Sequence, residues 1–472
     1  MDNKDKVVYV VSDMHLGPGW LPNGQLDPLE DFVSGEAFAR FLDQIGQSRE
    51  PVELVIAGDF LEYCQTVPAI GLASPQDDLG STEDESLLRT RVIVGLEPRR
   101  SSGHAVVFQA LRRFMMENHS VTIIAGNHDI DLLWKRVWAL IFDTIYPPGA
   151  WCDLRRVAYS YTLGRGAQGR VFIEHGHEHD RANRFGDLMS QPFGLDRFGV
   201  RRLKRCWGTL FVDKVYNDLE RERWFIDNVK PILRIVKLGL RHDFIFTAQA
   251  LGLVMRFLLS SGLPPILGRA MATDEEYAAP NLDALAQEIA DPDLARAIML
   301  QLQDPEGRKA LEMALEGMDM PPEVVLAGAR DALRLDEPEA AEAQPMVLGS
   351  LRAGGDDLLL GGAPREDDYR MAARAVLESD PSLTTVIMGH THTPINGFND
   401  PLRLADGREG YFFNTGTWTQ HLRDEAHRSY TWPELADPRN YTTSFTYVRL
   451  DPDGAGGYRP SLHSWAEESG ER

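Results

Sequence analysis

The sequence is poor in cysteine and has no apolar segment of signal-peptide type at its start. Only 3 of the 472 residues are cysteine, and Cys64, Cys152 and Cys206 are widely spaced. An odd number of widely spaced cysteines argues against a set of structural disulfides and favours a reducing compartment. The first ten residues, MDNKDKVVYV, contain no apolar run of the length found in signal peptides. We therefore expect a cytoplasmic location.

Long uncharged hydrophobic segments and an excess of positive charge are also missing. The most apolar later stretch, residues 244–264, is interrupted by Gln249 and Arg256, whereas a membrane-spanning helix needs roughly 20 nearly uncharged apolar residues. The formal net charge of −22 disfavours non-specific binding to the nucleic-acid backbone over the whole chain. A content of 43% hydrophobic and 25% charged residues is typical of a soluble globular protein.

Residues 7–17, VVYVVSDMHLG, combine a run of β-branched residues with two residue types that bind metals. The valines predict a buried strand, and the strand ends where Asp13 and His15 appear. Side chains at positions i and i+2 point to the same side of an extended chain. Asp13 and His15 can therefore bind one ion beyond the carboxyl end of the strand, which is the edge where sites form in open α/β sheets.

The same pattern occurs at four other places in the chain. Each is an apolar run that predicts a strand, and each is followed by a residue able to bind a metal, with a glycine beside it that lets the backbone turn sharply. These segments are residues 53–59 (ELVIAGD), 121–127 (VTIIAGN), 170–176 (RVFIEHG) and 384–390 (TTVIMGH). Residues 411–418, YFFNTGTW, predict a further strand.

Helical patterns lie between these strands, for example at residues 35–45. Alternation of strands and helices predicts an α/β fold with a layered core flanked by helices. Residues 1–195 and 380–472 would form this core as one discontinuous domain. Residues 196–379 would form a large, mainly helical insertion, with a flexible linker near residues 336–366.

The insertion begins with a basic segment, although the whole chain is acidic. Residues 196–241 contain 12 Lys and Arg against 6 Asp and Glu. Residues 228–264 are first basic and amphipathic and then apolar, which would suit a peripheral contact with a membrane or lipid or an ordinary pair of helices that face the core. The basic segment is also the basis of an alternative function, a nuclease acting on DNA or RNA. The size of the insertion is the basis of another, a membrane-recruited binding module.

Seven residues at the strand ends form the candidate site. Taken singly, a histidine in a turn or an aspartate after a strand usually has a structural role such as capping a helix. Their joint occurrence, without any cysteine, favours a metal site with imidazole, carboxylate and amide ligands. Seven ligands are too many for one catalytic ion that keeps an open position, so two ions sharing a carboxylate fit better. The candidates are Asp13, His15, Asp59, Asn127, His175, His390 and His392.

The chemistry of these ligands suits two divalent or trivalent ions. Manganese or iron is our first expectation, with zinc, cobalt or nickel as alternatives. His175 is the expected ligand in the sequence EHGHEHD, because it ends the strand and precedes a glycine, but His177 or His179 could take its place. Glu178 and Asp180, in the same segment, could support the ligands or lie on the surface.

The order of these motifs resembles that of the calcineurin-like metallophosphoesterases. The family pattern is D-x-H, G-D-x-x-[DE], G-N-H-[DE], H and G-H-x-H, and the resemblance covers about residues 5–195 and 380–450. One mild departure is Glu62, where many members have aspartate. The corresponding segments are Asp13-Met14-His15, Gly58-Asp59-Phe60-Leu61-Glu62, Gly126-Asn127-His128-Asp129, His175 and Gly389-His390-Thr391-His392.

The resemblance implies roles for these residues. Asp59 would bridge the two ions, a metal-bound hydroxide would attack phosphorus, and His128 would protonate the leaving group or stabilise its charge. Asp129 would orient His128. The first ion would be held by Asp13, His15, Asp59 and His392, and the second by Asp59, Asn127, His175 and His390.

Within this family, the branch that resembles UDP-2,3-diacylglucosamine hydrolase looks nearest, because His175-Gly176 and residues 389–394 bracket the insertion. The insertion is much larger than the cap of that branch, so we do not carry over a lipid substrate. Arg423 follows the last of these strands and could bind a substrate phosphate or lie in a solvated loop. The sequence thus predicts a metal-dependent hydrolase of a small phosphodiester, pyrophosphate or phosphomonoester.

Overall fold

The computed structural model describes most of the chain outside the expected insertion. The described residues are 6–66, 79–180, 182–186, 191–226, 366–423 and 430–465, together with 228, 243, 246, 247, 250 and 253. Two compact units can be distinguished. The first contains Met1–Asp213, Pro364–His421 and Thr442–Arg472, and the second contains Lys214–Ala363 and Leu422–Tyr441.

A six-stranded sheet forms one half of the core of the first unit. Its strand order is β15-β14-β1-β2-β3-β4, with β1 to β4 parallel and with β14 and β15 antiparallel. The strands are β1 (Val8–Val11), β2 (Glu53–Ala57), β3 (Ser120–Ile124), β4 (Leu154–Val157), β14 (Thr446–Pro452) and β15 (Tyr458–Ser464).

A five-stranded sheet forms the other half, in the order β10-β11-β9-β6-β5. Here β6, β9 and β11 are parallel, whereas β5 and β10 are antiparallel to their neighbours. The strands are β5 (Ser160–Leu163), β6 (Arg170–Glu174), β9 (Leu383–Met388), β10 (Leu402–Arg403) and β11 (Glu409–Asn414).

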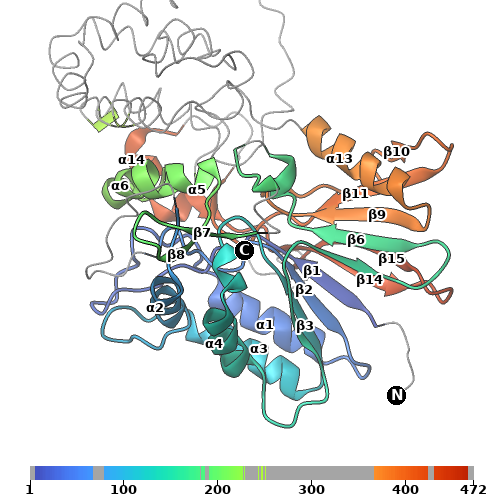
Figure 1. Ribbon diagram of the computed structural model, residues 1–472, viewed down its shortest axis with the longest axis horizontal. Coiled ribbons are helices and arrows are strands. Elements are labelled where there is room, and N and C mark those ends of the chain that lie inside the picture. Colours follow the sequence, from blue (N-terminus) through green and yellow to red (C-terminus); the bar gives the residue numbers. More distant parts are fainter. Residues whose placement is uncertain are drawn as a thin grey trace, which may run out of the picture. The chain divides into compact units, whose positions relative to one another are not determined.

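The two sheets pack face to face, and alternation along each strand separates the layers. Val8 and Val10 lie between the sheets with Ile387 and Phe413, all fully buried. The other face of the six-stranded sheet packs against α1 (Gly35–Gly46), α3 (Ala105–Met116) and α4 (Lys135–Ile145), and the other face of the five-stranded sheet packs against α13 (Glu366–Ser379). Figure 1 shows α1, α3 and α4 on one side of β1 to β3 and α13 beyond β9.

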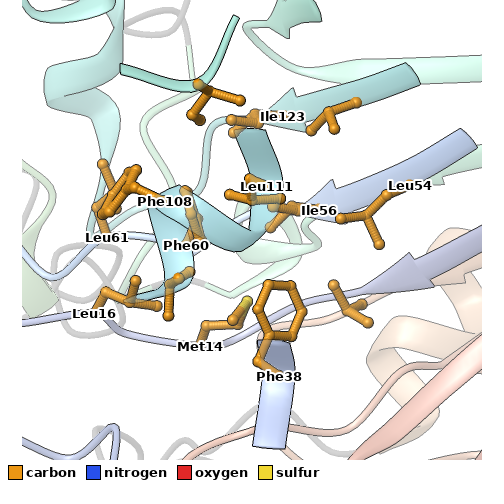
Figure 2. Packing of buried hydrophobic residues seen from close by; sticks show 14 of the residues in the cluster. Met14, Leu16, Phe38, Leu54, Ile56, Phe60, Leu61, Phe108, Leu111 and Ile123 are labelled. Carbon is orange, nitrogen blue, oxygen red and sulfur yellow. The ribbon is translucent and has the colours of Figure 1, made fainter. Parts of the chain in front are cut away.

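The packing between α1, α3 and the six-stranded sheet explains why these segments are helical. Phe38 and Phe41 recur at helical spacing in α1 and are fully buried, as are Leu54 and Ile56 of β2. Figure 2 shows Phe38, Phe108 and Leu111 meeting Leu54, Ile56 and Ile123 in this layer. The apolar periodicity of residues 35–45 therefore predicted this helix correctly, and the expected α/β core of stacked sheets flanked by helices is confirmed.

Smaller elements complete the first unit. They are α2 (Glu83–Ile93), the one-turn helices η1 (Ile130–Leu133) and η2 (His177–His179), the hairpin of β7 (Phe193–Leu195) and β8 (Arg201–Leu203), and α5 (Trp207–Phe211). The strand β8 lies near the start of the expected insertion, for which mainly helical structure was predicted. Gly199, with φ 75°, allows the tight turn that joins these two short strands.

The second unit is described over short segments, including α6 (Asn217–Glu222) and α14 (Trp432–Leu435). The helical character expected for residues 254–365 and the linker at 336–365 lie outside the described residues, and so do most of residues 228–264. The domain boundaries drawn from the sequence stay a prediction, although β8 and α13, which the expected insertion included, belong to the first unit. Among the described residues, no helix is both long and apolar enough to cross a membrane.

Candidate metal centre

Five strands of the two sheets deliver the predicted ligands from their carboxyl ends. The loops after β1 and β2 stay paired, because the backbone N–H groups of Met14 and His15 both donate to the Asp59 carbonyl at 2.9 Å. In the other sheet, the N–H of Gly389 donates to the His175 carbonyl at 2.9 Å. Backbone hydrogen bonds thus fix the ligand loops to each other within each sheet.

The backbone is strained at the ligands themselves. In the described part of the chain, seven residues other than glycine have a positive φ, and five of them are predicted ligands. Such left-handed conformations cost about 1–2 kcal/mol each and persist where the surrounding structure enforces them. The five are Asp13 (φ 51°), His15 (48°), Asp59 (48°), His390 (69°) and His392 (57°).

Glycines beside the ligands allow the loops to approach closely. Gly58 has a φ of 91°, and a Cβ atom there would overlap the His175 ring. A Cβ atom at Gly126 would overlap the Asp59 carboxylate. Space therefore requires the glycines of both the G-D and the G-N motif, and the positive φ of Gly58 adds a conformational requirement at that position.

One group of ligands comes from the loops after β1 and β9. The ligand atoms of Asp13, His15 and His392 lie within 4.8 Å of one another. The Nε2 atoms of His15 and His392 are 3.2 Å apart, and His392 Nε2 is 3.4 Å from Asp13 Oδ1. Two imidazole nitrogens and a carboxylate oxygen that converge in this way form a suitable set for a transition-metal ion.

A second group forms around Asp59. The ligand atoms of Asp59, His175 and His390 also lie within 4.8 Å of one another, and the Oδ1 atom of Asn127 is 3.1 Å from His175 Nε2. Asp59 Oδ2 is 3.1 Å from His175 Nε2 and 3.7 Å from His15 Nε2. One carboxylate therefore faces both groups, which is the position of a bridging ligand.

Neighbouring acceptors fix which nitrogen of each histidine points into the site. His15 Nδ1 donates to Glu62 Oε2 at 2.8 Å, and His175 Nδ1 donates to the carbonyl of Ala57 at 3.0 Å. The Nε2 atoms of both rings are left for an ion. His390 instead uses Nε2 to bond Asp180 Oδ2 at 3.1 Å, so its Nδ1 remains. Outer partners of this kind orient metal-binding histidines.

The site combines deeply buried carboxylates with imidazoles. Burial opposes ionisation of Asp13, but the hydrogen bond and charge of His392 outweigh it, and the pKa of Asp13 falls to about 2. Burial likewise disfavours a charged His175, yet Asp59 raises its pKa to about 9. Buried like this, the groups need compensating charge. Protons supply that charge in the metal-free protein, and metal cations can replace them.

His128 and Asp129 lie at the site, but they do not form the pair implied by the resemblance. His128 Nδ1 bonds Glu62 Oε2 at 2.6 Å. The Asp129 carboxylate accepts backbone hydrogen bonds from Gly126 at 2.6 Å and from Phe60 at 2.9 Å. The orienting role expected for Asp129 is therefore corrected: Glu62 orients His128, and Asp129 joins the loops after β2 and β3 because its carboxylate faces their N–H groups.

The alternative histidines in EHGHEHD point to other partners. The His177 ring is buried, with Nε2 3.4 Å from Glu178 Oε1, and His179 Nε2 bonds Glu174 Oε1 at 2.7 Å. His175 alone of the three belongs to the convergent groups in the described residues. Asp180, which could have been a surface residue, is 2% exposed and supports His390.

Arg423 is the one predicted site residue outside the first unit. It belongs to the second unit, where its Nε donates to the carbonyl of Tyr441 at 3.2 Å and its backbone N–H donates to Asn440 at 2.9 Å. Its expected contact with a substrate phosphate stays a prediction.

The segment after β11 supports the site in a way that the sequence did not indicate. Thr417 donates its hydroxyl to the Asp13 carbonyl at 2.7 Å, and Asn414 donates its amide to the Gly389 carbonyl at 2.6 Å. Ser12 hydrogen-bonds the Asp13 carboxylate and lies 2.5 Å from the Thr415 hydroxyl. The run of small polar residues in NTGT was the available signal, since such residues bond neighbouring backbone.

The comparison with protein families agrees with this geometry. Residues 6–208 match the family model of the calcineurin-like phosphoesterases. No curated protein matches the chain. Residues 6–208 are thus similar to the calcineurin-like phosphoesterases, and the chain carries a metallophosphoesterase domain with candidate His and Asp metal-binding groups. His390 and His392 lie outside the matched range, yet their side chains join the same groups.

Proposed function

We propose that the protein is a dinuclear-metal-dependent phosphoesterase. The observation that carries the proposal is the convergence of carboxylate, imidazole and amide ligands from both sheets on the two sides of Asp59. Asp13, His15, Asp59 and His392 would hold one ion. Asp59, Asn127, His175 and His390 would hold the other.

The donor set fits two such ions. Its oxygen and nitrogen atoms suit manganese or iron first, and zinc, cobalt or nickel as alternatives. Bound there, the pair of ions would supply Lewis-acid activation of a water molecule and would neutralise the developing charge on the phosphoryl group. Proton transfer to the leaving group would be carried out by a residue of the chain.

His128 is suited to transfer a proton to the leaving oxygen. Glu62 holds its Nδ1 atom, which leaves Nε2 as the nitrogen that can give up a proton. Burial lowers the pKa of His128, but the charges of Glu62 and Asp59 raise it well above its usual value. In the metal-free protein these charges favour the protonated ring, which is the form that a general acid requires. Asp129 keeps the His128 loop in place through its backbone hydrogen bonds.

The substrate we propose is a small phosphodiester, pyrophosphate or phosphomonoester. The resemblance to the UDP-2,3-diacylglucosamine hydrolase branch remains a prediction that rests on motif order. A nuclease gains no support from the basic segment, because several of its arginines have acidic partners. Arg202 pairs with Glu85 and Asp196, and Arg205 pairs with Asp213, at 2.9–3.0 Å.

The test combines metal content with turnover. Purified protein loaded with Mn²⁺ should hydrolyse bis-p-nitrophenyl phosphate, and Asp59→Asn should lose both metal and turnover, because one carboxylate serves both ions. Asp43→Asn is the matched control, since Asp43 is exposed and pairs only loosely with Arg113 at 3.6 Å. A metal-loaded wild-type protein that turns over no phosphate ester with any divalent ion would refute the proposal.

A further inference from the structure

A third group of metal-ligand side chains lies beside the proposed dinuclear site. Ligand atoms of Glu62, Cys64 and His128 all lie within 4.8 Å of one another. Cys64 is 7% exposed and Glu62 is 1% exposed, and the side chain of His128 is 11% exposed. The thiol is also within hydrogen-bonding reach of the imidazole. The ligand atoms of these three side chains are therefore close enough together to bind one ion.

This group differs in chemistry from the seven predicted ligands. A thiol, an imidazole and a carboxylate together favour Zn²⁺ or Cd²⁺. The dinuclear ligands contain no sulfur, and they suit harder ions. Two neighbouring groups of ligands thus favour different classes of cation, because thiolate ligands bind soft ions strongly and bind Mn²⁺ or Mg²⁺ weakly.

We propose that Glu62, Cys64 and His128 form an inhibitory site for a single thiophilic divalent cation such as Zn²⁺ or Cd²⁺. Binding forms bonds from the cation to the Cys64 sulfur, a His128 ring nitrogen and a Glu62 oxygen. The thiol proton and the proton on the bound imidazole nitrogen leave to solvent, and no electrons are transferred. Metal binding by thiols and imidazoles releases protons in this manner.

The expected consequence is loss of the proton donor. A cation bound to His128 removes the proton that the ring would give to the leaving group. The cation also competes for the Glu62 carboxylate, whose Oε2 atom accepts a hydrogen bond from His15 Nδ1 at 2.8 Å. His15 would then lose the partner that orients its ring. The inhibitory effect rests on the proposed phosphoesterase function, whereas the binding of the cation does not.

The three cysteines of the chain provide matched controls. All three are buried, and none is part of a disulfide. Cys152 donates to the carbonyl of Met115 at 3.4 Å, and Cys206 lies 3.5 Å from the Thr209 hydroxyl, so neither belongs to the group around His128. Cys152→Ser removes a buried thiol that has no contact with the group, and Cys206→Ser removes one that bonds Asn183 Oδ1 at 3.9 Å and is not a member of the group.

The experiment is a titration of the Mn²⁺-loaded protein with Cd²⁺, followed by the ultraviolet charge-transfer absorption of the cadmium–thiolate bond. Wild type, Cys152→Ser and Cys206→Ser should each gain this band at one equivalent, and Cys64→Ser should not. In parallel, the Zn²⁺ concentration that halves bis-p-nitrophenyl phosphate turnover should rise at least about tenfold in Cys64→Ser, since even the loss of an outer partner weakens metal sites about 10–100-fold.

Absence of the band in wild type, or its persistence in Cys64→Ser, overturns the inference. So does equal Zn²⁺ inhibition of Cys64→Ser and Cys152→Ser. If Cys64→Ser does not fold, Cys64→Ala takes its place, and the wild-type titration decides by itself. The absorption measurement does not depend on turnover. A protein that binds Cd²⁺ through Cys64 but cleaves no phosphate ester would therefore refute the proposed phosphoesterase function and still support the proposed cation site.

Discussion

Glu62 connects two histidines with different tasks. Its Oε2 atom accepts from His15 Nδ1 and His128 Nδ1, and its Oε1 atom accepts from the backbone N–H groups of Cys64 and Gln65. Burial raises the pKa of Glu62, but His128 and His15 lower it to about 2. The carboxylate is therefore ionised at any working pH, and it positions a ligand and a proton donor at once.

Glu62→Gln should lower kcat about 10–100-fold, the range found when an outer partner of a metal ligand is lost. Loss of the carboxylate also removes a charge that raises the pKa of His128. His128 would then lose its proton at lower pH, so the alkaline limb of the pH–rate profile should move to lower pH. Glu97→Gln, at an exposed pair with Arg91, is the control. An unshifted alkaline limb would contradict the role given to Glu62.

Removing the metals should make stability depend on pH through His175. The pKa of its ring rises from 6.5 to about 9 in the metal-free fold, so its stabilising effect is complete below pH 6.5 and is lost as the pH rises toward 9. The difference amounts to at most about 3 kcal/mol. Thermal unfolding with a chelator should therefore show a lower Tm at pH 9 than at pH 6.5.

His175→Asn is the comparison for this pH effect, because the amide does not titrate. Its Tm in the chelator should change less between the two pH values than that of wild type. Added Mn²⁺ should raise the Tm of wild type more at pH 9, where it no longer competes with the imidazole proton. Equal pH dependence of the variant and wild type would show that His175 does not exchange a proton for a metal.

Residue types and strand ends predicted which side chains gather at the site, but not their hydrogen-bond partners. His128 and Asp129 are adjacent in sequence, which favoured a pair. In the structure, the partner of His128 is Glu62, 66 residues earlier. Spacing along one strand tells which side a residue faces, whereas a partner from another strand depends on how two loops pack. For the same reason the support from Thr417 and Asn414 was not predictable.

At the scale of elements, the turn from each strand into its ligand loop determines the geometry. The β-branched runs predicted the strands because such residues pack well in a buried sheet. The left-handed conformations of Asp13, Asp59 and His390 carry no comparable signal, since aspartate and histidine adopt them only when the fold enforces it. The glycines beside Asp59 and His390 were the visible part of this pattern.

Gly58→Ala should destabilise the protein by more than about 3 kcal/mol, the range of changes that force buried groups apart. The added methyl group combines strain at a φ of 91° with overlap on the His175 ring. Gly24→Ala is the matched control, because Gly24 has a φ of 82° and open space around it, so it should show only the backbone cost of about 1–2 kcal/mol. Similar losses for both variants in chemical denaturation would mean that contact with His175 is unimportant.

At the scale of the whole first unit, the site exists because two sheets meet at their carboxyl ends. One sheet provides Asp13, His15, Asp59 and Asn127, and the other provides His175, His390 and His392. The layered α/β core was predictable from alternating periodicity. The β7–β8 hairpin was not, because strands of three residues leave too little periodic signal next to a helical segment.

The packing between the sheets should therefore matter for metal affinity as well as for stability. Ile387→Ala opens a space between the sheets, and Leu377→Ala opens one under α13; both side chains are fully buried. Each should cost about 2–5 kcal/mol. Only Ile387→Ala should also weaken Mn²⁺ binding in calorimetry, because it loosens the sheets that carry opposite ligands. Equal affinities of the two variants would contradict this coupling.

We expect the Asp59 carboxylate to join ligands from the two sheets into a site for a pair of ions. The most direct test is the electron paramagnetic resonance spectrum of the protein loaded with Mn²⁺, together with its metal content. Wild type should bind two ions per chain and show the signal of a spin-coupled pair, and Asp59→Asn should lose that signal. Isolated, uncoupled Mn²⁺ in wild type, or a coupled signal that survives in Asp59→Asn, would contradict the role of Asp59 as the ligand that both ions share.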